Sequence, residues 1–316
     1  MKHTVHVAFI TDNNFVMQTA TAIRSLVDAK SPDTEYDIRV VTADCSEESS
    51  AVLSAIEGVT VVRASLDAYR DIRQLAHIPI ACLLKFDLCE LLPDCDKLLY
   101  LDGDILVRED LSPLYETDLE GHILGAVAQH VLIGTDDRKF SAGVLLFDAK
   151  RMRDEKVRDK LVETRRALGE QRSMDQQSFN LLYGGNYLEL PPRYNCCPMQ
   201  LRDAAAKGMD RVNAYYGTAY ASVDDMLNDG AIVHFATGQK PWLYENIDYA
   251  WEWYASYART AFGGTKLTRK HYTVWISRFN GLKQAKKTGG WKGVCTFLMN
   301  AFRKKVLHRE IKNDWG

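Results

Sequence analysis

The stretch Lys97-Leu-Leu-Tyr-Leu-Asp-Gly-Asp-Ile-Leu-Val107 decides how the rest of the chain is interpreted. Residues 97–101 are mostly large and apolar, which is typical of a central strand covered on both faces. Asp102 and Asp104 follow where that strand should end, and ligands of open α/β sheets bind outside the carboxyl ends of strands. Two buried carboxylates one residue apart need a cation. The stretch therefore predicts a divalent metal that holds a phosphate-bearing ligand, with a solvated turn as the alternative.

Composition places the chain among soluble globular proteins. Its 316 residues, 46% of them hydrophobic, suffice for one large domain or one domain with appendages. The seven cysteines form no C-x-x-C pair and several lie in apolar runs. That pattern predicts reduced, packed thiols in a cytoplasmic protein. We expect no signal peptide, because the chain starts with a strand-like segment, and no membrane span, because no apolar run reaches 18 residues.

Charge divides the chain into two parts. From Phe262 onward there are 13 Lys+Arg and 2 Asp+Glu, a net of +11, which leaves −13 for the preceding residues because the whole chain carries −2. An acidic body is not typical of a nucleic-acid enzyme, and a basic tail indicates contact with an anionic surface. We therefore predict a catalytic domain over residues 1–261 and a basic, amphipathic, helical tail over residues 262–316.

Strand-like and helix-like segments alternate, which predicts an α/β fold with a largely parallel sheet. The predicted strands are 3–11, 36–43, 59–62, 97–101, 123–128, 140–148, 186–190 and 231–235. Helices are predicted at 15–29, after the capping residue Ser46, at 81–92, over the charged stretch 150–170, and from Ser173 onward. No G-x-G-x-x-G or P-loop motif follows the first strand, so neither a standard dinucleotide fold nor a Walker nucleoside triphosphatase is indicated.

Polar residues at the strand ends are the candidates for binding. Asp12, Asn14 and Phe15 follow the first strand and offer hydrogen-bond partners and a ring face for a base, although a plain capping turn explains them equally well. Lys85 lies inside a predicted helix, where a lone lysine is usually solvated. His234 ends a strand and precedes a loop with Gly238 and Lys240, the kind of loop that holds an anion.

Asp175 and Gln176 fall in the first turn of a predicted helix, where an acid also serves as a simple capping residue. Ser141 belongs to a run of small residues that permits the close approach of a ligand.

Together these segments resemble glycosyltransferase family 8, the retaining nucleotide-sugar transferases, and are most similar to its bacterial lipooligosaccharide galactosyl- and glucosyltransferases. The matching segments occur in the family's order, at 9–15, 77–85, 94–107, 140–147, 175–180 and 234–242. The resemblance implies a GT-A fold, a Rossmann-like domain with a mixed, mostly parallel sheet. It also implies a UDP-sugar donor and a divalent ion, Mn²⁺ or alternatively Mg²⁺.

The resemblance assigns a role to each candidate. Asp12, Asn14 and Phe15 would contact the uridine, and Lys240 the phosphate. Asp102, Asp104 and His234 would hold the metal ion. Asp175 and Gln176 would face the transferred sugar as the catalytic pair, and His77 would line the site.

Three positions depart from the family pattern. Lys85 stands where the closest relatives have an arginine, which keeps the charge but loses bidentate geometry. Ser141 replaces a common asparagine that contacts the sugar. Thr237 occupies the usual glycine position, so that Gly238 comes one place late in the phosphate loop. These changes leave the choice between galactose and glucose open.

The predicted function is a metal-dependent hexosyltransferase that acts on a saccharide or lipid-linked acceptor in lipopolysaccharide or other surface glycan synthesis. The alternatives are a self-glucosylating, glycogenin-like primer, an inactive nucleotide-sugar binding module and a nucleotidyltransferase. In the tail, apolar residues recur at helical spacing from Val294 to Phe302 and are flanked by lysines. That pattern suits either a packed helix or a helix lying on the cytoplasmic, anionic face of the cell membrane.

Overall fold

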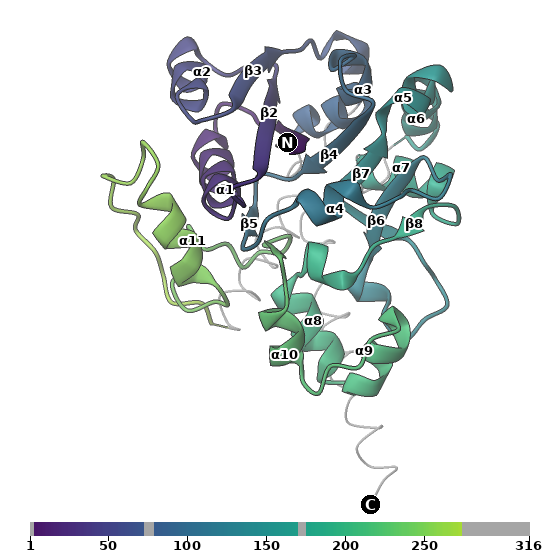
Figure 1. Cartoon of the computed structure of the whole chain (residues 1–316), viewed down its shortest axis with the longest axis vertical. Coiled ribbons are helices and arrows are strands. Elements are labelled where there is room, and N and C mark those ends of the chain that lie inside the picture. The colour runs from purple at the N-terminus through teal and green to yellow at the C-terminus, as the bar shows by residue number, and fades with distance from the viewer. Residues whose placement is uncertain (1–2, 73–78, 170–174, 274–316) are drawn as a thin grey trace, which may run out of the picture.

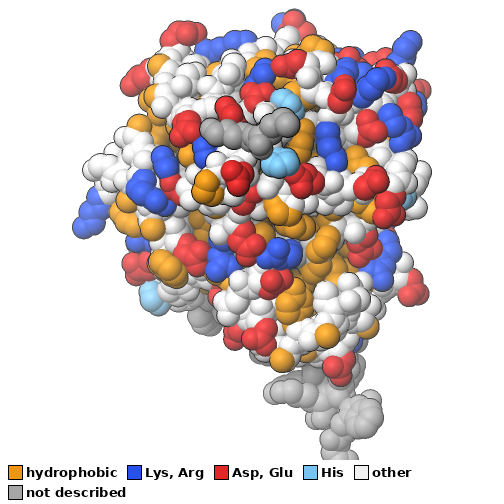
Figure 2. Space-filling model, viewed as in Figure 1, with side chains coloured by type: hydrophobic (Ala, Val, Ile, Leu, Met, Phe, Trp, Pro, Cys, Tyr) orange, Lys and Arg blue, Asp and Glu red, His pale blue; other side chains and the backbone are white. Residues whose placement is uncertain are grey.

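The computed structural model of the chain describes residues 3–72, 79–169 and 175–273 (Figure 1). His77, Cys295 and the helix expected around 294–302 lie outside the described residues. Figure 2 shows acidic and basic side chains interspersed over the face in view. In the described part of the chain, no helix combines the length and the apolar character needed to cross a bilayer.

A seven-stranded sheet in the order β3-β2-β1-β4-β7-β6-β8 forms the centre of the molecule. Its strands are β1 (His3–Ile10), β2 (Thr34–Thr42), β3 (Val59–Arg63), β4 (Lys97–Leu101), β6 (Leu124–Ala128), β7 (Phe140–Asp148) and β8 (Leu188–Glu189). All pairs are parallel except β4–β7 and β6–β7. The prediction of a mixed, mostly parallel sheet is therefore confirmed.

Helices cover both faces of this sheet, as Figure 1 shows. One face packs against α1 (Val16–Asp28), α2 (Glu47–Ser54) and α4 (Ser112–Glu116). The other packs against α3 (Leu88–Leu91), α5 (Ala149–Asp154), α6 (Val157–Ala167) and α7 (Asp175–Tyr183). Four more helices follow, α8 (Pro198–Ala205), α9 (Met209–Tyr216), α10 (Val223–Asn228) and α11 (Ala250–Tyr257), and α11 lies beside α1.

The side chains of β4 enter both cores in turn. Leu98 and Tyr100 belong to the cluster on the α5–α7 face, whereas Leu99 and Leu101 belong to the cluster on the α1 face. The three leucines are fully buried. Alternation along a strand sends neighbouring side chains to opposite faces, which explains why the apolar run is continuous.

Two helix predictions are wrong in detail. The stretch 81–92 is a 3-10 helix, Ile80–Phe86, followed by the short α3. Four consecutive residues of it, 83–86, are buried, so no single face could be recognised from its periodicity. The charged stretch 150–170 is two helices, α5 and α6, because Lys156 adopts a left-handed backbone with φ 51°.

The charged stretch is also less exposed than expected. Val157, Leu161 and Arg165 form a buried stripe at i, i+4 and i+8, which docks α6 onto the body. The expected packing of the cysteines is confirmed for the described residues: of Cys45, Cys82, Cys89, Cys95, Cys196 and Cys197, all but Cys82 are buried.

A small antiparallel ribbon links the carboxyl end of β4 to the C-terminal half of the chain. It pairs β5 (Ile105–Val107) with β9 (Ile232–His234), in a register that sets Ile105 opposite His234. The backbone N–H of Phe235 donates to the carbonyl of Asp104 at 2.9 Å. The ribbon therefore brings His234 beside the Asp-Gly-Asp turn, from which it is far removed in sequence.

Candidate active site

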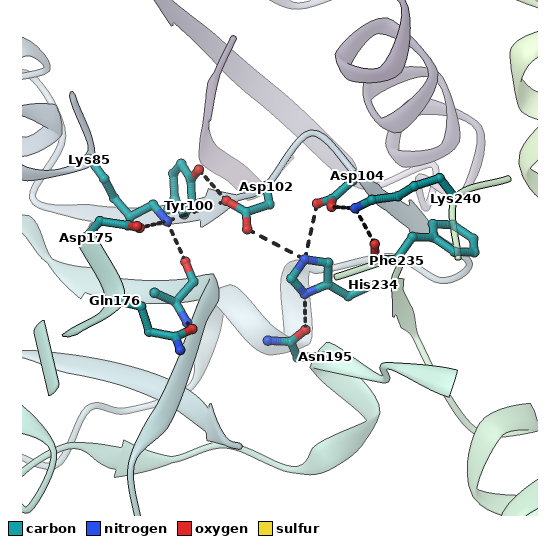
Figure 3. Close-up of polar contacts among 11 residues, drawn as sticks. Lys85, Tyr100, Asp102, Asp104, Asp175, Gln176, Asn195, His234, Phe235 and Lys240 are labelled. Carbon is teal, nitrogen blue, oxygen red and sulfur yellow. Dashed lines mark hydrogen bonds and ion pairs between the residues drawn. The ribbon is translucent and has the colours of Figure 1, made fainter. Parts of the chain in front are cut away.

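Three potential metal ligands converge at the end of β4. Asp102, Asp104 and His234 each offer a ligand atom, and these atoms lie within 4.8 Å of one another (Figure 3). Nε2 of His234 is 3.1 Å from Oδ1 of Asp104 and 3.6 Å from Oδ2 of Asp102. The carboxylates belong to the strand-end turn and the imidazole to β9, so the pairing of β5 with β9 assembles the cluster.

The hydrogen bonds of His234 make this cluster a fit for a cation. Its Nδ1 lies 2.8 Å from the side-chain oxygen of Asn195, which only accepts, so the ring proton belongs on Nδ1. Nε2 then presents a lone pair toward two carboxylates. Three electron-pair donors that face one another require a positive charge between them. A mixed set of two carboxylates and one imidazole suits Mn²⁺ better than the largely hydrated Mg²⁺.

A second cluster, His6, Asp37 and Cys95, meets the same distance criterion. There, however, the guanidinium of Arg39 already binds both oxygens of Asp37, at 2.7 and 2.9 Å. Both oxygens of Asp37 are thus engaged by one guanidinium, whereas Lys240 engages only Oδ2 of Asp104 and leaves Oδ1 facing His234. The cluster at His6 is therefore the weaker candidate for an ion.

Two glycines allow the cluster to form. A Cβ on Gly103 would lie 2.6 Å from the hydroxyl of Thr19 and 3.2 Å from the ring of Phe15, both on the helix α1 side. A Cβ on Gly143 in β7 would overlap the imidazole of His234 and lie 2.9 Å from Asp102. The glycine of the Asp-Gly-Asp turn is therefore a packing requirement, and so is the glycine of the Ser-Ala-Gly run.

Lys240 provides a positive charge next to Asp104. Its ammonium donates to Oδ2 of Asp104 at 2.6 Å and to the carbonyl of Phe235 at 2.5 Å. Burial alone would raise the pKa of Asp104, but the positive charge of Lys240 outweighs burial and holds that pKa far below its usual range. Asp104 is therefore a fully ionised carboxylate.

Lys85 is buried rather than solvated. Its side chain is 3% exposed, and its ammonium donates to Asp175 at 2.5 Å and to the carbonyl of Ala142 at 2.8 Å. It also lies 3.5 Å from Asp102 and 4.4 Å from the centre of the Tyr100 ring. Burial lowers the pKa of Lys85, but the two carboxylates raise it by more, so that it stays charged. Lys85 thus connects the metal-ligand cluster to Asp175.

Gln176 and Ser141 line a pocket of about 170 Å³ that also reaches His234. The side-chain oxygen of Gln176 accepts from the backbone N–H of Ala142 at 3.0 Å, which fixes its amide at the pocket wall. Asn195 lines the same pocket, and its side-chain nitrogen is buried without a hydrogen-bond partner in the described structure. A ligand oxygen there would satisfy that nitrogen.

The residues expected to bind a base lie beside this cluster. Asp12 accepts from the backbone N–H of Asn14 at 2.9 Å, as a capping turn would. The ring of Phe15 meets Trp242 edge-on, with centroids 5.6 Å apart. On the loop after β9, Thr237 accepts from the N–H of Gln239 at 3.2 Å, and Gly238 is exposed, with no atom within 4 Å of a Cβ built on it. Phe15 and the Lys240 loop thus meet through Trp242.

Two residues of the site were not found by sequence reasoning. The hydroxyl of Tyr100 donates to Oδ1 of Asp102 at 2.6 Å, and Asn195 orients His234. In the sequence, Tyr100 was interpreted only as part of the apolar strand. Strand alternation places it on the same face as Lys85, and that pattern could have indicated its role. Asn195 ends the 3-10 helix Pro192–Asn195 and gave no signal in the sequence.

Comparisons with known proteins agree with this geometry. The model of the family described as glycosyl transferase family 8 matches residues 6–246. Glycosyltransferase GlyF of Streptococcus pneumoniae is 26% identical over 244 residues, which are 73% of this chain and 55% of that protein. Glycosyltransferase GlyD of the same organism is 28% identical, over 73% of this chain and 28% of its own length. The chain thus spans about half or less of these relatives.

A solved structure is similar over nearly its whole length. Galactosyltransferase LgtC, in complex with donor and acceptor sugar analogues, superimposes with a TM-score of 0.68 and 25% identity, over 81% of this chain and 96% of that chain. The fold is therefore of the GT-A type, as predicted.

Substituting Gly143 by alanine tests how tightly the cluster is packed. The added Cβ collides with His234 and approaches Asp102, so Gly143→Ala should weaken Mn²⁺ binding by about tenfold or more, as a misplaced supporting group does. Calorimetry with Mn²⁺ measures this. Gly185→Ala, where a Cβ meets nothing within 4 Å, is the matched control. Equal affinities in the two variants would contradict the packing argument.

Lys240 and a metal ion compete for Asp104 in the nucleotide-free protein. Lys240→Met removes the ammonium 2.6 Å from that carboxylate, so it should tighten Mn²⁺ binding by about tenfold, equivalent to 1.4 kcal/mol. The same variant should weaken UDP binding if Lys240 contacts the phosphate, as the family resemblance implies. Lys150→Met, on the exposed surface of α5, is the charge-matched control. Unchanged or weaker Mn²⁺ binding by Lys240→Met would refute the competition.

Proposed function

The chain belongs to glycosyl transferase family 8, and we propose that it is a metal-dependent, retaining hexosyltransferase that moves galactose or glucose from a UDP-sugar to a saccharide acceptor. The convergence of Asp102, Asp104 and His234, with Lys240 beside them, carries this proposal. The cluster lies at the carboxyl end of a central strand, which is where α/β sheets bind their ligands.

The first task of the site is to bind the nucleotide and stabilise its departure. Asp12, Asn14 and Phe15 contact the uridine, and Thr237, Gly238 and Lys240 contact the diphosphate. Asp102, Asp104 and His234 hold Mn²⁺ or Mg²⁺, which, when bound, stabilises the negative charge that develops on the leaving diphosphate. Lys240, whose ammonium lies 2.6 Å from Asp104, would be near enough to this charge to contact a phosphate oxygen.

The second task is to position the sugar. Gln176 lines the pocket together with Ser141, and Asp175 precedes it as the first residue of α7. The amide can donate to and accept from sugar hydroxyls, and the carboxylate can accept from them. Lys85 is already bound to Asp175 and lies near Asp102, so it offers no free cation to an acidic sugar. A neutral hexose is therefore the donor sugar that this charge balance favours over a uronic acid.

The acceptor side of the pocket is uncharged. Its walls carry the amides of Gln129, Asn195 and Gln200 and the imidazole of His130. Burial lowers the pKa of His130 to about 4, so that ring is neutral near pH 7. Both ring nitrogens of His130 already have partners in the protein, so the neutral amides are the groups that suit saccharide hydroxyls, and the unpaired nitrogen of Asn195 is a ready donor. We assign the acceptor to a saccharide of lipopolysaccharide or another surface glycan, free or lipid-linked.

The basic tail completes the proposal. With 13 Lys+Arg against 2 Asp+Glu, residues 262–316 would hold the enzyme at the anionic cytoplasmic face of the cell membrane, where a lipid-linked acceptor is presented. The cytoplasmic, peripheral location and the domain boundary near residue 262 are parts of the same proposal.

A UDP-release assay tests the proposed chemistry. Release of UDP from UDP-galactose or UDP-glucose should stop in excess chelator and return best with Mn²⁺. Asp104→Asn should abolish turnover, with an unchanged circular dichroism spectrum. Asp175→Ala should reduce turnover about a hundredfold or more while UDP affinity stays near that of the parent, because its partner is the sugar. Full activity in chelator, or an equal loss of UDP affinity in Asp175→Ala, would contradict the assignment.

A vesicle co-sedimentation assay tests the tail. The full chain should bind vesicles containing phosphatidylglycerol and detach as salt rises, since each basic residue near such a surface contributes about 1 kcal/mol. Replacing the ten lysines and arginines from Arg278 to Lys312 by glutamine should abolish binding and leave UDP release intact. If that variant binds the vesicles like the parent, the tail is not the anchor.

A further inference from the structure

We call the cluster of Asp102, Asp104 and His234, with the pocket beside it, the transfer site. A second cavity lies away from it, between the C-terminal end of α1, the end of β5 and helix α11. Its volume is about 370 Å³, larger than the 170 Å³ pocket beside His234 and within the usual range for small-molecule sites. Figure 1 shows α11 lying alongside α1, and their contacts form one wall of this cavity.

The two ends of α1 separate this cavity from the transfer site. Phe15 precedes the helix at the proposed uridine position, whereas Asp28 ends it and lines the cavity. The helix has 13 residues, so the two positions are about 20 Å apart at the rise of an α-helix. A ligand in the cavity therefore does not occupy the donor position.

Trp251 gives the cavity an aromatic rim. Its side chain is 74% exposed, although its neighbours Ala250 and Trp253 are almost fully buried. Helix α11 thus packs through Trp253 and presents Trp251 outward at the cavity mouth. An indole has a broad apolar face and a polar N–H, a combination that serves ligands with both apolar and polar surfaces.

The cavity wall offers both hydrogen-bond donors and acceptors. Nε of Arg108 binds Oε2 of Glu252 at 3.0 Å, and Nη1 of Arg108 donates to the carbonyl of Gly230 at 2.9 Å. Within the described residues, Nη2 of Arg108, Oε1 of Glu252 and the side-chain amide of Asn228 make no hydrogen bond. One donor, one acceptor and one amide that can do both are thus unused by the protein.

The charges around the cavity are balanced. Arg108 is paired with Glu252, and Asp28 is paired with Arg24 and with Arg259, the latter at 2.5 Å. A phosphate would find only the unused Nη2 of Arg108 beside the carboxylate of Glu252, and a metal ion only the unused Oε1 of Glu252 beside the guanidinium of Arg108. An uncharged ligand with many hydroxyls avoids both conflicts, because it needs only the unused donors and acceptors.

We propose that this cavity is an accessory site for a neutral saccharide, in which a pyranose packs its C–H face on Trp251 and its hydroxyls bind Arg108, Asn228 and Glu252. The site is distinct from the transfer site. Only its use, to hold a distant unit of the glycan acceptor, rests on the proposed function.

Ligand-observed NMR on the full chain tests the site with maltotetraose, cellotetraose and galactotetraose as probes. At least one tetrasaccharide should bind, and binding should persist when UDP and Mn²⁺ saturate the transfer site. Trp251→Ala should weaken it about tenfold, as the loss of an aromatic platform does, and Trp251→Phe should largely restore it. Asn228→Ala should weaken it by about threefold, the effect of one neutral hydrogen bond.

The matched control is Leu181→Ala, which removes another exposed apolar side chain, 58% exposed on α7. It should bind like the parent, and every variant should release UDP from a UDP-hexose at the parent rate. The rate of UDP release is set at the transfer site. If neither the parent nor any variant released UDP, the proposed function would be refuted, but the accessory site would not. The absence of tetrasaccharide binding, or unchanged binding in Trp251→Ala, would overturn the accessory site. The accessory site would also be overturned if Trp251→Ala lost vesicle binding but kept saccharide binding.

Discussion

The site depends on balancing three carboxylates, Asp102, Asp104 and Asp175, at one edge of the sheet. Lys85 and Lys240 supply the permanent positive charges, and the lone pair of His234 faces the remaining gap. Removing one partner of a buried ion pair costs about 3–5 kcal/mol, so each of these charges adds to the stability of the folded site. Lys240 and His234 share the carboxylate of Asp104, so a cation bound there would compete with the ammonium.

The topology explains how residues so distant in sequence share this balance. Strand β4 is fixed between two cores and delivers Asp102 and Asp104 to the sheet edge. The β5–β9 register then delivers His234, and β7 contributes Gly143 as the neighbour against which both ligands pack. The strands that carry these side chains are buried, and the loop at 237–240 follows β9. Buried strands hold side chains in place more firmly than an exposed loop does.

The sequence predicted the strands better than the contacts between them. Lys97–Leu101 and Phe140–Asp148 have the predicted bounds, because long apolar runs between turn residues are strong local signals. The 3-10 helix at Ile80–Phe86 and the break at Lys156 were missed, since burial on all sides and a left-handed residue leave little periodic trace. The roles of Asp175 and Lys240 came from the resemblance. Their links to Lys85 and Asp104 are tertiary pairs that no local pattern specifies.

Strand β5 joins the transfer site to the accessory cavity without an intervening hinge. Asp104 precedes this strand and Arg108 follows it, so the two positions are about 13 Å apart at the rise of a β-strand. A glycan bound at the cavity would therefore not act by triggering a conformational change along this strand. Its effect is instead on effective concentration: a saccharide held at Trp251 keeps the remainder of the same chain near the transfer site. That gain requires an acceptor long enough to reach both sites at once. A monosaccharide acceptor should therefore be used equally well with or without Trp251, whereas a long glycan should not.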